Sequence, residues 1–121
     1  MEWAFIALVA FFAAGYIFLR RAGQVPVKDA HEYLHKGALI IDVRSPAEFK
    51  ARHLPNAINL PVDQIETTLP TRVKDRTQPI LLHCQAGTRS TVAKRKLNAL
   101  GYINAYNLGS YTRAERIIKS A

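Results

Sequence analysis

Short apolar runs and longer mixed segments follow one another along the chain, and their order predicts alternating strands and helices. The apolar runs occupy residues 38–43, 57–60, 80–82 and 103–108. Runs of this length, bounded by turn-forming residues, are typical of buried strands. The continuous apolar character of residues 38–43 is typical of a parallel strand that is covered on both faces.

Mixed segments with helical spacing separate these runs, at residues 29–36, 45–52, 63–69 and 110–120, with a further helix through residues 92–100. The sequence Ser45-Pro-Ala-Glu48 begins one of them, with Ser45 as N-cap and Glu48 as its capping-box partner. Residues 24–28 have two interpretations, an edge strand or the lead-in to a helix, because Pro26 cannot donate to a sheet. Together these elements predict an α/β domain with a mostly parallel sheet of about five strands wrapped by helices.

The first part of the chain has a different pattern. Residues 3–19 form an unbroken stretch of 17 residues without charge or proline. As a helix this stretch is about 26 Å long, at the short edge of what spans a bilayer. Trp3 stands at one end and Arg20 and Arg21 at the other, which is typical of the two interfaces of a membrane. We therefore expect residues 1–21 to be a transmembrane anchor and residues 22–121 to be the folded domain.

A cleaved signal peptide is the alternative to an anchor. It needs a basic start and an apolar stretch of only about 7–15 residues, whereas this chain begins Met1-Glu2 and carries its charges afterwards. Because positive charges stay on the cytoplasmic side, Arg20 and Arg21 predict a single-pass protein of the cytoplasmic membrane with its domain facing the cytoplasm.

The net charge of the domain indicates which kinds of partner it can attract. The whole chain carries a net charge of +8 from 17 basic and 9 acidic residues. Arg20, Arg21 and Glu2 belong to the apolar segment and its ends, which leaves a net charge of +7 on the rest. Such a surface attracts anions. No base-reading motif accompanies the charge, so we expect no nucleic-acid partner.

The candidate chemistry lies between the strand at residues 80–82 and the helix that follows. This loop, Cys84-Gln-Ala-Gly-Thr-Arg89, holds the only cysteine of the chain. A loop that enters a helix directs its backbone N–H groups and the positive end of the helix dipole into one space. Gly87 allows the chain to curl with a positive φ, and Arg89 adds a planar cation. The loop is therefore predicted to hold an anion beside Cys84.

A thiol in this position is predicted to be ionised at neutral pH, since comparable sites lower the pKa of cysteine from about 8.5 to roughly 3.5–7.5. The alternative is a buried structural cysteine, which is common among free thiols. Attack on sulfur requires a thiolate that solvent can reach, so a protonated sulfur, or one buried away from solvent, would overturn the assignment of a catalytic role.

Two further polar residues follow the strand at residues 38–43, at the sheet edge where ligands of α/β proteins bind. For Asp42 two roles are open, ordering the loop or capping a turn. Arg44 either supports the site or is solvated. Lys94, Arg95 and Lys96 follow the loop on its helix, where they either steer anionic donors to the site or form a solvated face. Together with Arg20 and Arg21, this basic cluster is also suited to acidic lipid headgroups.

Three motifs in this order resemble the single-domain rhodaneses. They are Leu39-Ile-Ile-Asp-Val-Arg-Ser-Pro-Ala-Glu-Phe49, His53-Leu-Pro-Asn-Ala-Ile-Asn-Leu-Pro61 and Leu82-His-Cys-Gln-Ala-Gly-Thr-Arg-Ser90. The resemblance covers about residues 25–119. It implies a rhodanese-like fold and sulfurtransferase activity, in which a sulfane sulfur passes from a donor such as thiosulfate to Cys84 as a persulfide, and then to cyanide or a thiol. It also implies that Gln85, Ala86, Gly87, Thr88 and Arg89 cradle the persulfide and the oxyanion of the donor.

The chain departs from the family pattern at three positions. Arg52 precedes His53 where the family usually has glycine, and its role is open between the site and solvent, as is that of His53. Asn56 replaces another glycine, and asparagine tolerates the left-handed conformation that such a turn needs. Gln85 is neutral, so binding of an anionic donor depends on Arg89 and the backbone.

The same loop also bears on the alternative functions. Rhodanese-related phosphatases carry one more residue between cysteine and arginine than the four present here, and the smaller ring suits a sulfur atom. A membrane-tethered persulfide relay, or a binding module for a partner protein, remains the alternative. The four histidines show no metal-ligand spacing, and the proposed chemistry needs no cofactor. The oligomeric state stays open.

Overall fold

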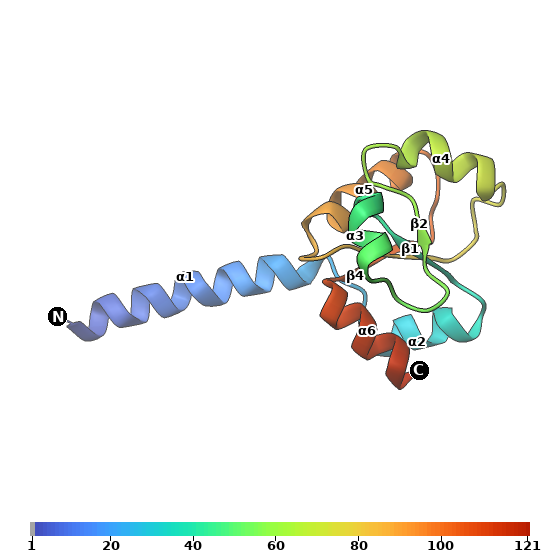
Figure 1. Ribbon diagram of the computed structural model, residues 1–121. Helices are drawn as coiled ribbons and strands as arrows, with labels where there is room; N and C mark the ends of the chain where they lie inside the picture. Colours follow the sequence, from blue (N-terminus) through green and yellow to red (C-terminus); the bar gives the residue numbers. More distant parts are fainter. Residues whose placement is uncertain (1) are drawn as a thin grey trace.

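The computed structural model describes residues 2–121, except for the side chains of residues 20–22. Arg20 and Arg21, predicted to mark the cytoplasmic interface, thus have side chains outside the described part. The elements follow the order α1 (Glu2–Ala22), α2 (Val27–His35), β1 (Leu39–Asp42), α3 (Pro46–Ala51), β2 (Ile58–Asn59), α4 (Ile65–Arg72), β3 (Ile80–His83), α5 (Thr88–Ala99), β4 (Ala105–Gly109) and α6 (Tyr111–Ser120) (Figure 1).

The strands form one parallel sheet in the order β2-β1-β3-β4. The predicted α/β class is therefore confirmed, but the expectation of about five strands is wrong, since the described sheet has four. The segment that could have been a fifth strand contributes one isolated bridge, between Gln24 and Asn107. Pro26 then occupies the N-cap of α2, where its missing N–H costs nothing, and the chain becomes helical at Val27.

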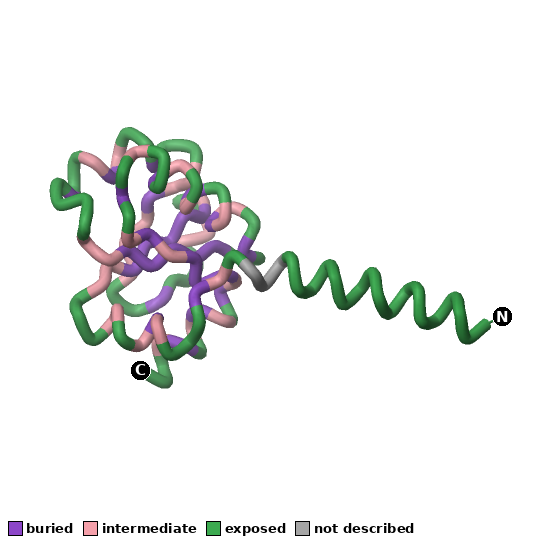
Figure 2. The backbone as a smooth tube through the Cα atoms, turned by 180° about the vertical axis from the view of Figure 1, so that it is seen from behind, coloured by how far each residue is buried: buried purple, intermediate pink, exposed green. Residues whose placement is uncertain are grey.

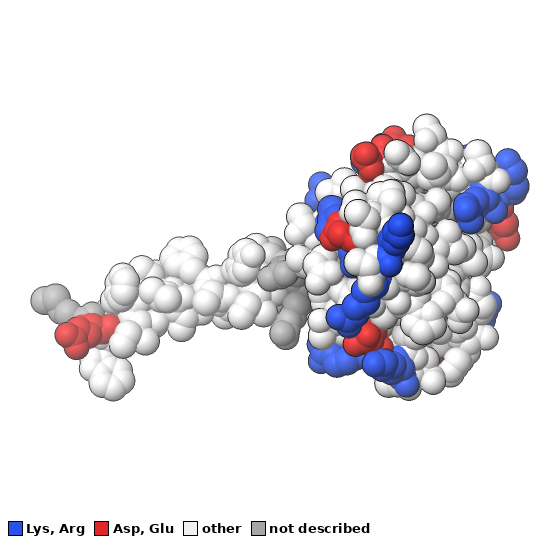
Figure 3. Space-filling model, in the orientation of Figure 1, with Lys and Arg blue, Asp and Glu red and all other residues white. Residues whose placement is uncertain are grey.

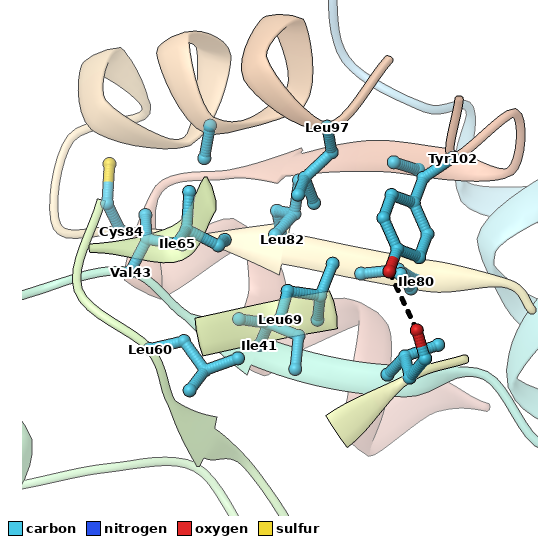
Figure 4. Close-up of a cluster of buried hydrophobic side chains, with 13 residues drawn as sticks. Ile41, Val43, Leu60, Ile65, Leu69, Ile80, Leu82, Cys84, Leu97 and Tyr102 are labelled. Carbon is cyan, nitrogen blue, oxygen red and sulfur yellow. Dashed lines mark hydrogen bonds between the residues drawn. The ribbon is translucent and has the colours of Figure 1, made fainter. Parts of the chain in front are cut away.

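Helices cover both faces of the sheet and close two apolar cores. The helices α4 and α5 lie on one side and α2 and α6 on the other (Figure 1). The first core includes Ile41, Leu82 and Leu97, and Cys84 lies at its end beside Val43 and Ile65 (Figure 4). The second core contains Leu81 and Leu108. Adjacent residues of β3 thus point to opposite cores, which is why this central strand reads as continuously apolar.

The helix starts follow their capping residues. Ser45 caps α3, and both hydrogen bonds of the predicted capping box to Glu48 are present. Ser110 likewise caps α6 by accepting from the N–H of Arg113. The helix expected at residues 63–69 begins later, at Ile65, after a turn, and continues through Pro70 to Arg72 because the N–H of Val73 still donates to the carbonyl of Leu69 at 2.8 Å.

Helix α1 extends away from the domain as a single rod (Figures 1 and 2). Its window Glu2–Leu19 has no buried residue and is long and apolar enough to cross a membrane, a property shared by membrane spans and signal sequences. Large apolar side chains such as Phe11 and Leu19 are about three-quarters exposed. Exposed apolar surface of this extent is typical of contact with a membrane or another protein.

Candidate active site

The candidate site is a loop between the central strand β3 and the helix α5. Cys84 follows the last residue of β3, and Gly87 occupies the N-cap of α5 with a φ of +97°. This left-handed conformation is one that residues with a side chain rarely adopt. A Cβ atom at Gly87 would also lie 3.6 Å from the Cα atom of Gly109. The predicted requirement for glycine at this turn is therefore confirmed by the backbone.

The sulfur of Cys84 lies inside the curl of the loop. The N–H of Gly87 donates to Sγ at 3.0 Å, and the hydroxyl of Ser90 lies 3.5 Å from Sγ. Burial by itself would raise the pKa of the Cys84 thiol, but hydrogen bonds from Ser90 and from the backbone amides of Gly87 and Ala86 outweigh it, so the pKa is lowered. The predicted stabilisation of a thiolate by inward-facing amides is thus present in the geometry.

The accompanying prediction that solvent reaches this sulfur is wrong for the conformation described. Cys84 is only 1% exposed. The reason is that Sγ turns inward onto the N–H of Gly87, and the apolar residues at the end of the first core, Val43 and Ile65 among them, fill the space beneath it (Figure 4). The site therefore combines an electrostatically favoured thiolate with a closed approach.

Arg89, expected to face the anion of the donor, makes its hydrogen bonds to Glu48 at the start of α3. Nη1 donates to Oε1 at 2.6 Å and Nη2 to Oε2 at 3.1 Å, so the two planar groups form a bidentate pair. Hydrogen bonds from Arg89 lower the pKa of Glu48 to about 2, and the pKa of Arg89 is raised by the same pair. The cation is therefore partly neutralised by a carboxylate of the protein.

A pocket of about 240 Å³ opens in front of this ion pair. Arg89 is its basic residue and Asp63 its acidic one, and the other lining residues are Val43, Ser45, Pro46, Pro61, Val62 and Gln64. Val43 also belongs to the buried cluster that holds Cys84. The pocket thus adjoins the cysteine loop and has room for a small anion such as a sulfur donor.

Asp42 and Arg44 lie together at the carboxyl end of β1, as predicted. The Asp42 carboxylate is fully buried and accepts from the backbone N–H of Arg44 and from its guanidinium, at distances between 2.8 and 3.0 Å. Arg44 in turn donates to the carbonyl of Arg52 at 2.6 Å and to the side chain of Gln85 at 3.4 Å. The pair therefore links β1 to the turn after α3 and to the cysteine loop without touching Sγ.

His83, which the sequence analysis did not single out, is fully buried beside the site. Its Nδ1 donates to the carbonyl of Cys84 at 3.2 Å, and Nε2 has no hydrogen-bond partner in the described structure. Burial lowers the pKa of His83, only partly opposed by the Asp42 charge, so the ring is neutral at pH 7. In the sequence, His83 follows a continuous apolar run, so nothing in the pattern indicates a polar role for it.

The remaining predicted residues are dispersed. Gln85, Ala86 and Thr88 form the exposed outer side of the loop, while Arg52 packs over the ring of Tyr111 and pairs with Glu115. His53 stacks on Phe49 and bonds to its carbonyl. Asn56 has a φ of +64°, which confirms the predicted left-handed turn.

The three residues of the basic cluster, Lys94, Arg95 and Lys96, have different surroundings on α5. Lys96 is directed to α4, where it pairs with Glu66 at 3.1 Å and donates to the carbonyl of Val62. Arg95 is exposed and lies beside the outer face of the cysteine loop, in a shallow pocket with Gly87 and Leu19. Lys94 is half-buried. Arg95 is therefore the member of the cluster that lies next to the loop.

Sequence reasoning missed two contacts that shape the site. Glu48 was assigned only its capping function, although its carboxylate also holds Arg89. Ser90 was quoted in the motif without a role, although its hydroxyl is next to the sulfur. The spacing of Ser90 from Cys84 places it in the first turn of α5, close to the start of the loop, and this spacing could have indicated the contact. In the described part of the chain, no group of three or more His, Cys, Asp or Glu side chains is arranged to hold a metal ion.

The cysteine loop thus lies at the carboxyl edge of a parallel α/β sheet, which is where this class of protein binds its ligands. The family model described as the rhodanese-like domain matches residues 26–114. The chain therefore belongs to the rhodanese family, as its motifs indicated.

Relatives and solved structures agree with this assignment. The chain is 31% identical over 98 residues to the thiosulfate sulfurtransferase PspE of Escherichia coli, covering 81% of this chain and 88% of that protein. It is 27% identical over 85 residues to the thiosulfate sulfurtransferase GlpE of Pseudomonas syringae, covering 70% and 78%. The structure of the human single-domain sulfurtransferase TSTD1 superposes with a TM-score of 0.64 at 26% identity, covering 82% of this chain and 98% of that one.

Proposed function

We propose that this protein is a membrane-anchored sulfurtransferase that carries a sulfane sulfur on Cys84. The observation that supports this most directly is the sulfur inside the loop, which accepts the N–H of Gly87 at 3.0 Å and has a lowered pKa. Membership of the rhodanese family and likeness to two thiosulfate sulfurtransferases support the reaction class. Residues 1–21 form the anchor and residues 22–121 the catalytic domain.

In the proposed reaction, the Cys84 thiolate attacks the outer sulfur of a donor such as thiosulfate. A new S–S bond forms on Sγ, the bond between the two donor sulfurs breaks, and its electron pair leaves with sulfite. The cysteine persulfide carries the negative charge that the thiolate brought. Cyanide or a cellular thiolate then attacks the terminal sulfur and returns Cys84 to its thiolate. The amides of the loop stabilise the charge in both halves of the reaction.

The closed approach to Cys84 gives the donor step a structural requirement. Solvent must reach Sγ before a donor can, so the loop around Cys84 must open. Release of Arg89 from Glu48 would free a cation for the oxyanion of the donor. We therefore assign donor binding to Arg89 and to the pocket in front of it, and support of the loop to Asp42 and Arg44.

The test is an intact-mass measurement on the purified full chain. Incubation with thiosulfate should add one sulfur atom, cyanide should remove it with formation of thiocyanate, and Cys84→Ser should add none. Arg89→Ala should lower donor use while leaving the fold intact, and the matched change Arg52→Ala, at an exposed arginine that follows α3, should have no effect. Equal activity in the Cys84→Ser protein would end the proposal.

A dedicated relay to one partner protein is the second candidate, and the engagement of Arg89 by Glu48 favours it. A small dianion must displace a bidentate carboxylate to reach this arginine, which slows turnover with free thiosulfate. A relay loads sulfur on Cys84 but turns over slowly with cyanide or small thiols. The ratio of loading to turnover in the mass experiment therefore separates the two candidates.

We also propose that α1 spans the cytoplasmic membrane with the domain on the cytoplasmic side. The apolar window Glu2–Leu19 and the Arg20-Arg21 pair after it support this orientation. Protease added to the outside of intact spheroplasts should leave the domain uncut, and lysis should expose it. A domain that is found soluble without residues 1–21 would indicate a signal sequence instead.

A further inference from the structure

The membrane-side helix is fastened to the same edge of the sheet as the cysteine loop. Only Gly23 separates the end of α1 from Gln24, which bridges to Asn107 of β4. The N–H of Val25 donates to the carbonyl of Asn107 at 2.9 Å, so this attachment is part of the sheet's hydrogen bonding. Because all strands are parallel, Asn107 lies near the carboxyl edge at which Cys84 follows β3.

Gly109 is the residue that both segments approach. A Cβ atom on Gly109 would lie 2.6 Å from the side-chain nitrogen of Gln24, and one on Gly87 would lie 3.6 Å from the Cα atom of Gly109. Ala86 also bridges to Ser110, the next residue along the chain. The tether and the cysteine loop are therefore packed on either side of one glycine, which fixes how near the loop is to the base of α1.

The domain surface around this attachment carries exposed arginines on both sides. A shallow pocket of about 230 Å³ runs from Leu19 across Gly87 to Arg95 on α5, and another of about 240 Å³ runs from Tyr16 and Ala86 to Arg116 on α6. In the space-filling view, blue side chains lie on the domain above and below its junction with the rod, whose one coloured residue is an acidic one at the far end (Figure 3).

These arginines differ in what they already bind. Arg113 is held by the carbonyls of Leu108 and Val25, so it belongs to the attachment itself. Arg95 and Arg116 are exposed, and neither forms an ion pair with any side chain that the structure describes. The neighbouring carboxylate, Glu115, is directed to Arg52 and Lys119. Two unpaired cations thus flank the end of an apolar helix.

We infer that this face, defined by Arg95 and Arg116 on either side of the base of α1, is a docking surface for anionic phospholipid headgroups. The inference rests on the proposed membrane anchor. With α1 in a bilayer and one residue of linker, the face is held beside the headgroups, where charges act over about 8 Å in physiological salt. Each cation near an anionic surface strengthens attachment about fivefold. Docking places the outer side of the cysteine loop, at Ala86 and Gly87, against the membrane surface.

Hydrogen exchange of the full chain in lipid nanodiscs tests this surface. Discs of phosphatidylcholine are compared with discs in which about a third of the lipid is phosphatidylglycerol. We expect amides of residues 85–95 and 110–117 to exchange about fivefold more slowly in the anionic discs, and the difference to disappear in high salt. The double variant Arg95→Gln/Arg116→Gln should remove the difference.

The matched control is Arg72→Gln/Lys74→Gln, which deletes two exposed cations from the opposite edge of the sheet, before β3. It should leave the slowing intact. Equal exchange in both kinds of disc, or loss of the slowing in the control variant, would overturn the docking surface. Slowing by free glycerol phosphate in phosphatidylcholine discs would assign a soluble anion instead. A chain that does not enter discs at all refutes the anchor, whereas sulfur loading of Cys84 is measured independently of either result.

Discussion

The carboxylate of Glu48 and the guanidinium of Arg89, the last residue of the cysteine loop, meet in a bidentate pair with hydrogen bonds of 2.6 and 3.1 Å. Glu48 belongs to the first turn of α3 and Arg89 to the first turn of α5. The pair thus joins the beginnings of two helices and engages the cation that an anionic donor would need. It connects the stability of the loop with its proposed chemistry.

Removing this carboxylate should favour an anionic donor. In Glu48→Gln, Arg89 loses its charged partner and becomes free to bind thiosulfate. Because both side chains are more than one-third exposed, the gain is modest, about fivefold in KM for thiosulfate. Steady-state kinetics with cyanide as acceptor measures it. An unchanged or higher KM would show that Arg89 does not bind the donor.

The same pair should make stability depend on acid. Folding lowers the pKa of Glu48 from 4.5 to about 2, so its ionised form stabilises the native state above pH 4.5, and this contribution is lost as the pH falls toward 2. Solvent screening reduces the contribution to about 1 kcal/mol. Urea unfolding at several pH values should show Glu48→Gln less stable than the parent at pH 6, and the gap should shrink below pH 3. A gap that is constant over this range contradicts the assignment.

Ser90 should contribute to the lowered pKa of Cys84. Ser90→Ala removes the hydroxyl 3.5 Å from the sulfur, and loss of one hydrogen bond to a charged group raises the thiol pKa by about one unit. The rate of alkylation by iodoacetamide against pH reports this value directly. Thr91→Val is the matched control, because both hydroxyls donate to the carbonyl of Gly87 and only that of Ser90 also lies beside the sulfur. Equal shifts in both variants would indicate a general loosening of the loop.

Asp42 should be a structural requirement of the site. Asp42→Asn leaves the guanidinium of Arg44 buried without its counter-charge, which costs about 3–5 kcal/mol of unfolding free energy. Urea unfolding followed by circular dichroism measures the loss. Glu115→Gln, which breaks an exposed ion pair with Arg52, should leave the midpoint unchanged. If Asp42→Asn has the same free energy of unfolding as the parent, the Asp42–Arg44 pair does not contribute to stability.

Much of the fold followed from local sequence. Continuous apolar runs located the strands, and the capping box at Ser45 located a helix start to within one residue. The expected fifth strand failed because Pro26, without an N–H group, ends pairing after a single bridge at Gln24 and begins α2 instead. Edge strands depend on a neighbour that periodicity alone does not reveal.

The site was predictable in its residues but not in its closure. Loop geometry follows from Gly87 and the strand–helix junction, so the amide contact to the sulfur was foreseeable. The burial of Cys84 depends on Val43 and Ile65, and the partner of Arg89 depends on the approach of α3, and all of these are distant in sequence from the loop. Such long-range contacts leave no periodic signal, and Glu48 already had a local explanation in its capping box.

The single glycine between α1 and the first sheet contact also restricts how the protein meets its partners. A longer, flexible linker would let the domain move away from the end of α1, whereas Gly23 leaves almost no reach. With α1 in a bilayer, the protein diffuses in two dimensions and its cysteine loop stays at a nearly constant height. An acceptor that is itself an integral membrane protein can then meet the cysteine loop by diffusion within the membrane. A soluble acceptor has to approach the lipid surface to receive the sulfur.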